Sequence, residues 1–422
     1  MSEWKTYKLS DIASLSNGIN FDKSAYTRGI KLIGVADFKD RIYPDYDTLQ
    51  EVDTKVVRCS DLLKKGDIVF VRSNGNKELV GRCMMINKDI PVTFSGFCIK
   101  LSLNDKEKFD PLFFNYLFKT DQFRRKMSGT AVGANIQNLS QSRLGGCEVS
   151  VPKKEIQHRI ATVLSRYDTL IENCQKQIKL LEEAAQRLYK EWFVDLRFPG
   201  YENVKMVDGL PEGWERKTLG EVVTKSIGGG WGKETPQEKY DREGYVIRGT
   251  DISKLKNGSL NEIPFRYHTE SNLKERTLSD GDIIFEVSGG SEKEPVGRMY
   301  LITQPILDYY SKDVICASFC KKVSFTNKMI SVLCYFAMQH CRNTGDMKKF
   351  EKDSAGNIIN FAWTTFLQDF HVLLPNNEVL NAFYRRVNAI INSEVKLSLQ
   401  IRLLTEARDR LLPRLMGGEM EV

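Results

Sequence analysis

The most regular hydrophobic pattern in the chain is a heptad stripe, and it occurs twice, each time after a proline. Behind Pro152, apolar residues recur in alternating steps of four and three from Ile160 to Trp192. Behind Pro375, the same steps give a second stripe, in which eight of ten positions are apolar. A sustained heptad predicts a long helix with one narrow face that needs a partner. With one such helix in each half of the chain, we predict that the two pack against each other as an antiparallel coiled coil. The seam is predicted to contain Ile160, Leu164, Ile171, Ile178, Leu181, Leu188, Val387, Ile390, Leu397, Ile401, Leu404 and Leu411.

The remaining sequence has shorter apolar runs that are broken by Gly, Asn, Asp and Ser. KGDIVFVRSNG at 65–75 and DGDIIFEVSGG at 280–290 each predict a buried strand followed by a polar turn. Pro111–Lys126 has a helix-like pattern. These segments predict mixed α/β globules rather than an all-helical protein.

The two halves also repeat each other in sequence. GDIVF recurs as GDIIF, Val80-Gly81-Arg82 recurs as Val296-Gly297-Arg298, and GANIQN at 133–138 recurs as AGNIIN at 355–360. IKLLEEAAQRL at 178–188 matches IRLLTEARDRL at 401–411 in seven of eleven positions, without a gap. Matches in the same order along both halves indicate an internal duplication.

We therefore predict an α+β protein with a pseudo-two-fold internal repeat. It has two mixed α/β domains, at residues 1–151 and 214–374, which are separated by the antiparallel pair of long helices, at 152–193 and 375–422. Residues 194–213 contain Pro and Gly without a period, which predicts a linker.

Composition and charge limit the class of protein. The chain has 422 residues, is 41% hydrophobic and opens without a stretch typical of a signal peptide, so we expect a soluble cytoplasmic protein with no membrane partner. Its 62 basic and 55 acidic residues leave a net charge of +7, which permits a polyanionic partner that touches only part of the surface. The nine cysteines match no standard zinc spacing, so free thiols are expected and a metal site is not.

This layout resembles the specificity subunits of Type I restriction-modification systems. The resemblance is carried by the Trp-containing start of each copy, the GDI(V/I)F strand, the GANIQN-like segment before (V/L)P, the repeated LLxEAxxRL helix and the connecting FPGYENVKMVDGLPEGW. It implies two target-recognition domains, each reading half of a bipartite double-stranded DNA site, with helices that set the spacer and dock other subunits. The implied partners are two modification subunits, which carry S-adenosylmethionine, and two motor-nuclease subunits, which use ATP and Mg. This chain itself is expected to bind no cofactor.

Catalytic motifs are not evident in the sequence. No Pro-Pro is present, although an adenine methyltransferase of this kind would need one, and Gly228–Lys233 lacks the spacing of a phosphate-binding loop. The chain is therefore expected not to be an enzyme. Two alternatives stay open: a divergent fused restriction-modification enzyme with its own methyltransferase or nuclease activity, and a coiled-coil scaffold.

Candidate DNA contacts follow from the chemistry of base and phosphate recognition. Arg and Lys read guanine, Asn and Gln read adenine, and Ser, Lys and Arg also hold phosphates. Polar turns rich in these types predict contacts, although ordinary solvated turns have the same composition, and asparagines shared by both copies could be structural. The candidates are Lys23, Ser24, Tyr26, Arg28, Arg72, Ser73, Asn74, Asn76, Lys77, Asn135, Gln137, Trp231, Lys233, Arg248, Ser288, Ser291, Lys293 and Asn357.

Overall fold

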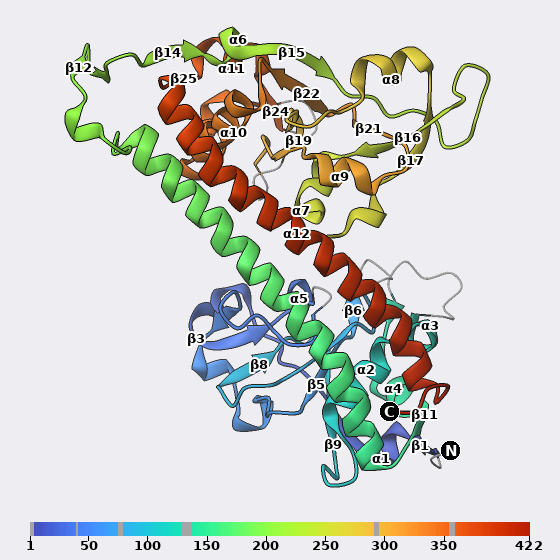
Figure 1. Ribbon diagram of the computed structural model, residues 1–422. Coiled ribbons are helices and arrows are strands. Elements are labelled where there is room, and N and C mark those ends of the chain that lie inside the picture. The colour runs from blue at the N-terminus through green and yellow to red at the C-terminus, as the bar shows by residue number, and fades with distance from the viewer. Residues whose placement is uncertain (1–3, 39–40, 75–78, 129–136, 291–294, 354–358) are drawn as a thin grey trace. The chain divides into compact units, whose positions relative to one another are not determined.

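The computed structural model describes residues 4–38, 41–74, 79–128, 137–290, 295–353 and 359–422. The chain forms two compact units (Figure 1). Unit 1 comprises Met1–Leu170 together with Leu404–Val422, and unit 2 comprises Ile171–Leu403. Two long helices, α5 (Lys154–Tyr189) and α12 (Asn377–Met416), each contribute residues to both units. A mixed α and β fold with long helices, as the sequence predicted, is confirmed.

Unit 1 is built around the strand that GDIVF predicted, β5 (Ile68–Val71). This strand is fully buried and lies in the four-stranded antiparallel sheet β2-β9-β5-β7. Its side chains alternate between two hydrophobic clusters: Ile68 and Phe70 pack in one, and Val69 and Val71 in the other. Because successive side chains of a strand point to opposite faces, an unbroken apolar run is what a sheet covered on both faces requires.

The other sheets of unit 1 are smaller. They are β4-β3-β8, in which β3 and β8 are parallel, and the antiparallel pairs β1-β11 and β10-β6. The strands are β1 (Lys5–Lys8), β2 (Ala13–Asn17), β3 (Tyr26–Ile33), β4 (Gln50–Val52), β6 (Ser73–Asn74), β7 (Cys83–Met85), β8 (Val92–Phe94), β9 (Cys98–Leu103), β10 (Gln137–Asn138) and β11 (Glu148–Val151). The helices are α1 (Leu9–Ile12), α2 (Pro111–Lys119), α3 (Asp121–Ser128) and α4 (Gln141–Gly145), with short 3-10 turns η1 (Lys23–Ala25), η2 (Val35–Asp37), η3 (Thr54–Val56) and η4 (Cys59–Asp61).

The helix-like stretch at 111–126 is two helices, not one. Thr120, between α2 and α3, has an extended backbone, with φ −62° and ψ 144°. Its hydroxyl donates to the carbonyl of Leu117 at 2.7 Å and accepts the N–H of Phe123 at 3.3 Å. One side chain therefore ends α2 and begins α3, which a hydrophobic pattern alone does not reveal.

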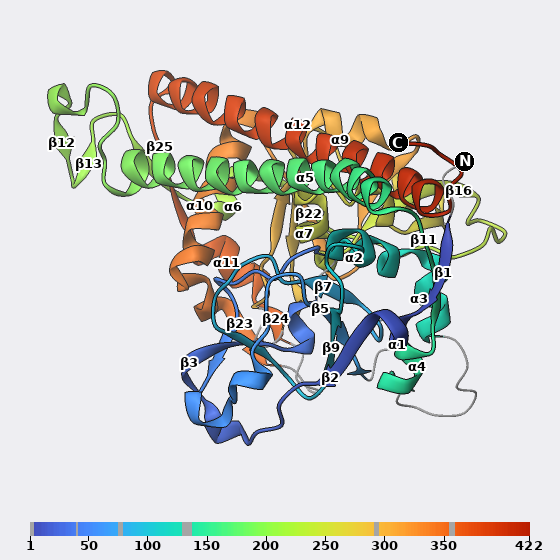
Figure 2. The same cartoon turned by 90° about the horizontal axis from the view of Figure 1, so that it is seen from below.

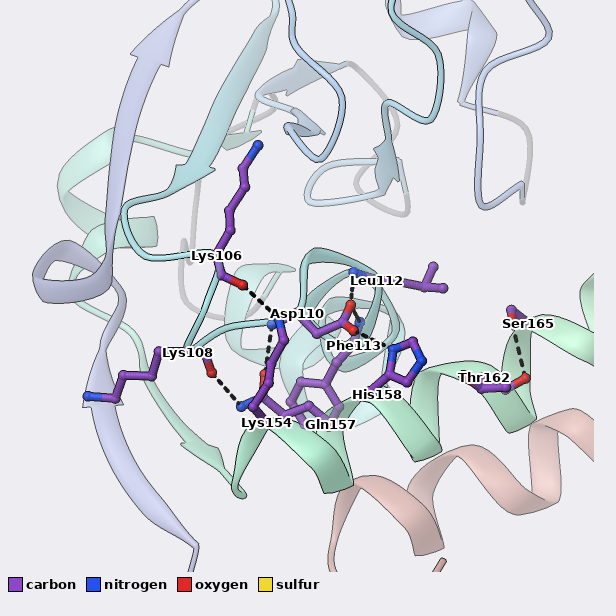
Figure 3. A network of polar contacts seen from close by, with 10 residues as sticks. All are labelled: Lys106, Lys108, Asp110, Leu112, Phe113, Lys154, Gln157, His158, Thr162 and Ser165. Atoms are coloured by element: carbon purple, nitrogen blue, oxygen red, sulfur yellow. Dashed lines mark hydrogen bonds and ion pairs between the residues drawn. The ribbon is translucent and has the colours of Figure 1, made fainter.

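A polar network joins the start of α5 to the start of α2 (Figure 3). Asp110 caps α2 by accepting the N–H groups of Leu112 and Phe113, at 2.9 and 3.4 Å. Gln157 of α5 accepts the Asp110 N–H at 2.8 Å, and its amide donates to the carbonyls of Lys108 and Pro152. Gln157 is 1% exposed, so these bonds satisfy a buried amide and fix the helix on unit 1.

Unit 2 has sheets of the same strand order. Its four-stranded antiparallel sheet is β15-β22-β18-β20, a three-stranded sheet is β17-β16-β21 with β16 and β21 parallel, and β14 pairs with β25. A further sheet is β19-β24-β23. The strand that GDIIF predicted is β18, which is central and buried like β5.

The elements of unit 2 are bounded as follows. The strands are β12 (Met206–Val207), β13 (Leu210–Pro211), β14 (Glu215–Thr218), β15 (Val223–Gly228), β16 (Arg242–Ile247), β17 (Phe265–His268), β18 (Ile283–Glu286), β19 (Ser288–Gly290), β20 (Met299–Leu301), β21 (Asp313–Cys316), β22 (Cys320–Phe325), β23 (Glu351–Asp353), β24 (Ile359–Phe361) and β25 (His371–Leu374). The helices are α6 (Leu219–Val222), α7 (Ile252–Lys256), α8 (Glu270–Arg276), α9 (Gln304–Tyr309), α10 (Lys328–Thr344) and α11 (Trp363–Asp369). A π-helical turn η5 (Lys190–Val194) follows α5, and the 3-10 turns are η6 (Tyr201–Asn203), η7 (Gly249–Asp251), η8 (Leu260–Glu262) and η9 (Asp346–Phe350).

The parts of α5 and α12 that belong to unit 2 run antiparallel (Figures 1 and 2). Tyr189 and Trp192, near the end of the first helical segment, pack on Phe383, near the start of α12, with ring centroids 6.4 and 5.9 Å apart. Earlier in α5, Glu182 lines the same pocket as Glu394 of α12. Ile171, Ile178, Val387 and Ile401 of the predicted seam are buried in this unit, whereas Leu181, Leu188, Ile390 and Leu397 are half-buried.

The seam position at Glu394 is charged rather than apolar. Lys256 of α7 lies between the two helices: its ammonium contacts Glu182 at 2.6 Å, and its carbonyl accepts the hydroxyl of Ser398. Burial raises the pKa of Glu394 to about 8, and the Glu182 carboxylate adds to the rise, whereas Lys256 opposes it.

In unit 1, the first part of α5 packs with the end of α12. Ile160, Leu164 and Leu415 are buried in one cluster, and Leu411 packs against it half-buried; Leu404 is also half-buried. The charged seam position here is Arg408, which contacts the Asp168 carboxylate at 2.6 Å, and Tyr116 of α2 donates to the same carboxylate at 2.5 Å. The charged break at Arg408 is therefore paired with a carboxylate that lies outside the stripe.

The segment predicted as a linker contains the short hairpin β12-β13, with Met206 opposite Pro211. Phe198 is 3% exposed and its ring lies 4.8 Å from that of Trp214.

All nine cysteines are free thiols, and all except Cys59 and Cys147 are buried. Within the described parts of the chain, no helix combines the length and apolar character needed to cross a bilayer.

Candidate DNA interface

Six of the predicted DNA contacts fall outside the residues that the structure describes, and of a seventh, Gln137, only the backbone is described. The six are Asn76, Lys77, Asn135, Ser291, Lys293 and Asn357. The others can be placed within their own unit.

In unit 1, two polar segments that lie far apart in the sequence become neighbouring strands. β6 carries Ser73 and Asn74, and it pairs antiparallel with β10, so that Ser73 faces Asn138 and Asn74 faces Gln137. The strand pair continues from Arg72, whose carbonyl accepts the N–H of Leu139 at 2.8 Å. The sequence singled out both segments, but only folding brings them together.

Unit 2 repeats this pairing. Ser288 of β19 faces Asn360 of β24, as Ser73 faces Asn138 in unit 1. The carbonyl of Val287 accepts the N–H of Phe361 at 2.8 Å, as that of Arg72 does for Leu139 in unit 1. The shared Asn-Ser pairing supports a structural role for the repeated asparagines.

Four further candidates of unit 1 lie at η1 and the start of β3. Lys23, Ser24, Tyr26 and Arg28 are all exposed. The Tyr26 ring meets Phe21 edge to face at 5.2 Å, which fixes an aromatic surface beside two cations. Such a cluster can hold phosphates and contact bases.

In unit 2, Trp231 and Lys233 belong to a glycine-rich loop that is well packed. The Arg266 guanidinium lies 4.9 Å from the Trp231 ring, and Trp231 remains 39% exposed. Lys233 exchanges backbone hydrogen bonds with Tyr267. Beneath the loop, His268 is fully buried, and neither ring nitrogen has a hydrogen-bond partner among the described residues. Burial lowers the pKa of His268, so the imidazole is neutral at pH 7.

Arg248 is already engaged within unit 2. Its Nε and one terminal nitrogen each donate to the Asp251 carboxylate at 2.7 Å, and Asp251 is completely buried. One edge of the guanidinium fork is thus used to satisfy a buried charge, which leaves the other edge for a ligand.

A tight turn that sequence patterns do not indicate adjoins predicted contacts in each unit. In unit 1 it is the β-turn Ser95–Cys98, held by five backbone bonds between 2.8 and 3.3 Å. Gly18 at the end of β2 lies so close to it that a Cβ there would be 2.2 Å from the carbonyl oxygen of Ser95. The five bonds run from Cys98 N to Ser95 O, Ser95 N to Ile33 O, Ile19 N to Phe94 O, Gly18 N to Cys98 O and Arg72 N to Phe97 O.

The β-turn Ala317–Cys320 of unit 2 is held by the same five bonds, between 2.8 and 2.9 Å. Gly229 takes the place of Gly18, with a hypothetical Cβ 2.1 Å from the carbonyl oxygen of Cys316. The bonds run from Cys320 N to Ala317 O, Ala317 N to Ile247 O, Gly230 N to Cys316 O, Gly229 N to Cys320 O and Val287 N to Phe319 O. Each turn therefore ties the loops that carry the predicted contacts into one backbone frame.

Several known proteins are similar to this chain in sequence. The family model described as "Type I restriction modification DNA specificity domain" matches residues 1–183. The Type I restriction enzyme MjaIX specificity subunit of Methanocaldococcus jannaschii is 28% identical over 320 residues, which cover 73% of this chain and 68% of the relative. The HindI specificity subunit of Haemophilus influenzae is 24% identical over the full length of both chains. In sequence, this chain is similar to the specificity subunits of Type I restriction systems.

A solved structure of a specificity subunit shares the fold. The S subunit of a Type I system from M. genitalium aligns with a TM-score of 0.58 at 16% identity, over 98% of this chain and 96% of that one. The resemblance stated from sequence motifs is thus confirmed at the level of the family. The described residues contain no group of three or more His, Cys, Asp or Glu side chains arranged to hold a metal ion.

Proposed function

We propose that this chain is the DNA-reading subunit of a Type I restriction-modification complex and that it performs no catalysis itself. Residues 1–151 and 214–374 form two target-recognition domains of an internal repeat, and each reads one half of a bipartite double-stranded target. α5 and α12 form the antiparallel coiled coil that sets the spacer and docks two modification subunits. Two motor-nuclease subunits complete the complex in the cytoplasm, and S-adenosylmethionine, ATP and Mg are bound by these partners.

The observation that carries the proposal is a shared backbone frame with different side chains. Both units pair a polar strand with the segment around Asn138 or Asn360, on turns held by the same five bonds. On this frame unit 1 presents Arg72 and Asn74, where unit 2 has Val287 and Gly289. A common scaffold with different donors and acceptors is what reading two different half-sites requires.

Methylome sequencing tests the proposal. We expect cells that express the chain with its modification subunit to carry methylated adenines in one bipartite motif. Replacing residues 1–151 with the first domain of another family member should change one half of that motif only. A change in both halves would contradict separate reading by the two domains.

The purified chain provides the control for catalysis. Incubated with S-adenosylmethionine and duplex DNA in the absence of partners, it should transfer no methyl group. Methyl transfer by the chain alone would support the fused-enzyme alternative instead.

A further inference from the structure

Two phenylalanines stand out on the surface of the candidate interface. Phe97 is 62% exposed and Phe319 is 65% exposed, and among the described residues no other phenylalanine is as open to solvent. They occupy the same position, the third residue of the β-turns Ser95–Cys98 and Ala317–Cys320. Neither the hydrophobic pattern nor the search for polar DNA contacts identifies them.

The backbone at both positions is firmly held. The Phe97 carbonyl accepts the Arg72 N–H at 2.8 Å, and the Phe319 carbonyl accepts the Val287 N–H at 2.9 Å. Gly18 and Gly229 pack against the turns at distances that no side chain would permit. A ring on a fixed turn loses little conformational freedom when it meets a ligand, which is the property of an anchoring residue.

The surroundings of both rings are polar. Arg72 donates from its guanidinium to the Gly96 carbonyl at 3.4 Å, one residue before Phe97, and Ser73 also donates to Phe97 through its N–H. Phe319 lies in the turn that packs on the glycine-rich loop, and its carbonyl accepts the N–H of Val287, the residue before Ser288. An apolar ring on a turn bounded by polar backbone groups, with a guanidinium beside it at Phe97, fits a ligand with an anionic exterior and an apolar interior, and stacked base pairs have that composition.

We infer that Phe97 and Phe319 are apolar wedges, each of which inserts at one base-pair step of its own half-target and partly unstacks it. This inference rests on the proposed function and deepens it. Phenylalanine is among the side chains that proteins insert between base steps. A methyltransferase must extrude its target base from the duplex, so a step already loosened by the specificity subunit lowers the cost of that extrusion.

The test uses the complex of the full chain with its modification subunit, and duplexes that carry the methylated motif. A single mismatch is moved step by step through each half-target. Replacing Phe97 by alanine should weaken binding to the intact duplex about tenfold, the scale of one base-aromatic contact. A mismatch at one step of the first half should restore most of that loss, because the step no longer has to be unstacked. Phe319→Ala should show the same behaviour in the second half only.

Matched variants exclude a general effect of removing surface apolar groups. Phe97→Leu keeps a wedge and should retain most of the affinity. Tyr201→Ala removes another exposed aromatic, 42% open to solvent, and should neither weaken binding nor respond to mismatches. Thermal melting of each variant should match the wild type because the replaced side chains are exposed.

The outcomes separate this inference from the proposed function. If the wild-type complex binds no specific DNA, the proposed function fails first. If it binds specifically but both alanine variants bind equally well, the wedge is wrong while the proposed function stands. A loss of affinity that no mismatch restores would indicate contact in a groove without unstacking, and a loss of the modification subunit would indicate a protein contact; either result overturns the inference.

Discussion

Unit 1 and unit 2 share their strand order and their backbone hydrogen bonds, yet they differ where polar side chains are buried. In unit 1, Tyr116, Asp168 and Arg408 form a polar triad. Aligning the helix caps Asp110 and Asn327 places Leu333 of unit 2 where unit 1 has Tyr116. Aligning the repeated LLxEAxxRL segments places Ile391 at the position of Asp168 and Ala185 at the position of Arg408. All three residues of unit 2 are buried.

Unit 2 has buried charges of its own at other places. Arg298 binds the Glu286 carboxylate through two nitrogens, at 2.9 and 2.6 Å, and Glu286 is 2% exposed. In unit 1, Val71 stands at the position of Glu286 in the corresponding strand. Likewise Arg248, which binds Asp251, corresponds to Gly34, which uses only its N–H to bind Asp37. The comparison shows that the backbone frame is the common part, whereas these buried charge pairs each occur in one unit only.

The largest expected effect comes from breaking the triad of unit 1. Asp168→Ala leaves the Arg408 guanidinium and the Tyr116 hydroxyl buried without their shared acceptor, which should destabilise unit 1 by about 3–5 kcal/mol. Installing the apolar counterparts from the second unit together, as Tyr116→Leu, Asp168→Ile and Arg408→Ala, should instead be close to neutral, because no buried charge is then left unpaired. Hydrogen exchange of the amides in unit 1 measures the stability of the single variant and of the triple variant.

The control for the triad is an exposed ion pair. Arg187 is 82% exposed and lies 3.6 Å from Glu183, so Arg187→Ala should change stability by less than about 1 kcal/mol. If the triple variant is as unstable as Asp168→Ala, the polar triad stabilises unit 1 more than the three apolar residues would. The buried side chains of the two units could then not be exchanged, although the backbone frames match.

An intermediate effect is expected at the two glycines that permit the close turns. Gly18→Ala and Gly229→Ala each force the backbone apart, and we expect a cost of about 1–3 kcal/mol in the unit concerned. Gly228→Ala is the matched control, because a Cβ at that position meets nothing within 4 Å. Denaturant unfolding of the three variants compares them. If Gly18→Ala leaves the free energy of unfolding unchanged while Gly229→Ala lowers it, the backbone at Gly18 has more room for a side chain than the backbone at Gly229.

The smallest effect depends on pH and concerns unit 2 alone. Because burial raises the pKa of Glu394 to about 8, the folded state holds this proton over a pH range in which the unfolded chain has lost it. The ionised carboxylate therefore costs stability that is absent below the unfolded pKa, near pH 4.5, and grows as pH rises to about 8.

Glu394→Gln should remove that cost. The variant should be more stable than the wild type by about 1–2 kcal/mol at pH 8 to 9, a value kept small by partial exposure, and equal to it near pH 4 to 5. Thermal melting across this range is the measurement. A constant difference at all pH values would mean that Glu394 does not titrate with folding.

The sequence predicted those features that depend on local patterns. The strands at β5 and β18 follow from unbroken apolar runs, and the helices α5 and α12 follow from heptads that span many turns. The break at Thr120 was missed because a single hydroxyl, and not a change in hydrophobicity, divides α2 from α3.

The sequence pattern does not predict features that depend on contacts between residues far apart in the chain. Asn138 meets Ser73 only through the pairing of β10 with β6, and Arg408 and Tyr116 meet only through the Asp168 carboxylate, which a third helix carries. Phe97 and Phe319 were not among the predicted contacts, because composition does not reveal which apolar residues are exposed. The signal that could have found them is positional: each directly precedes the cysteine that begins β9 or β22 in its copy.

Unit 1 is discontinuous, since Leu404–Val422 completes a core that begins near the other end of the chain. On the ribosome, the segment Met1–Leu170 emerges early but must wait for Leu415 and Met416, which are 2% and 7% exposed in that core. The whole of unit 2 is synthesised during the interval. Unit 2 can therefore fold first. The core of unit 1 is completed only after α12 has been synthesised, so the unit that is translated first is the last to fold completely.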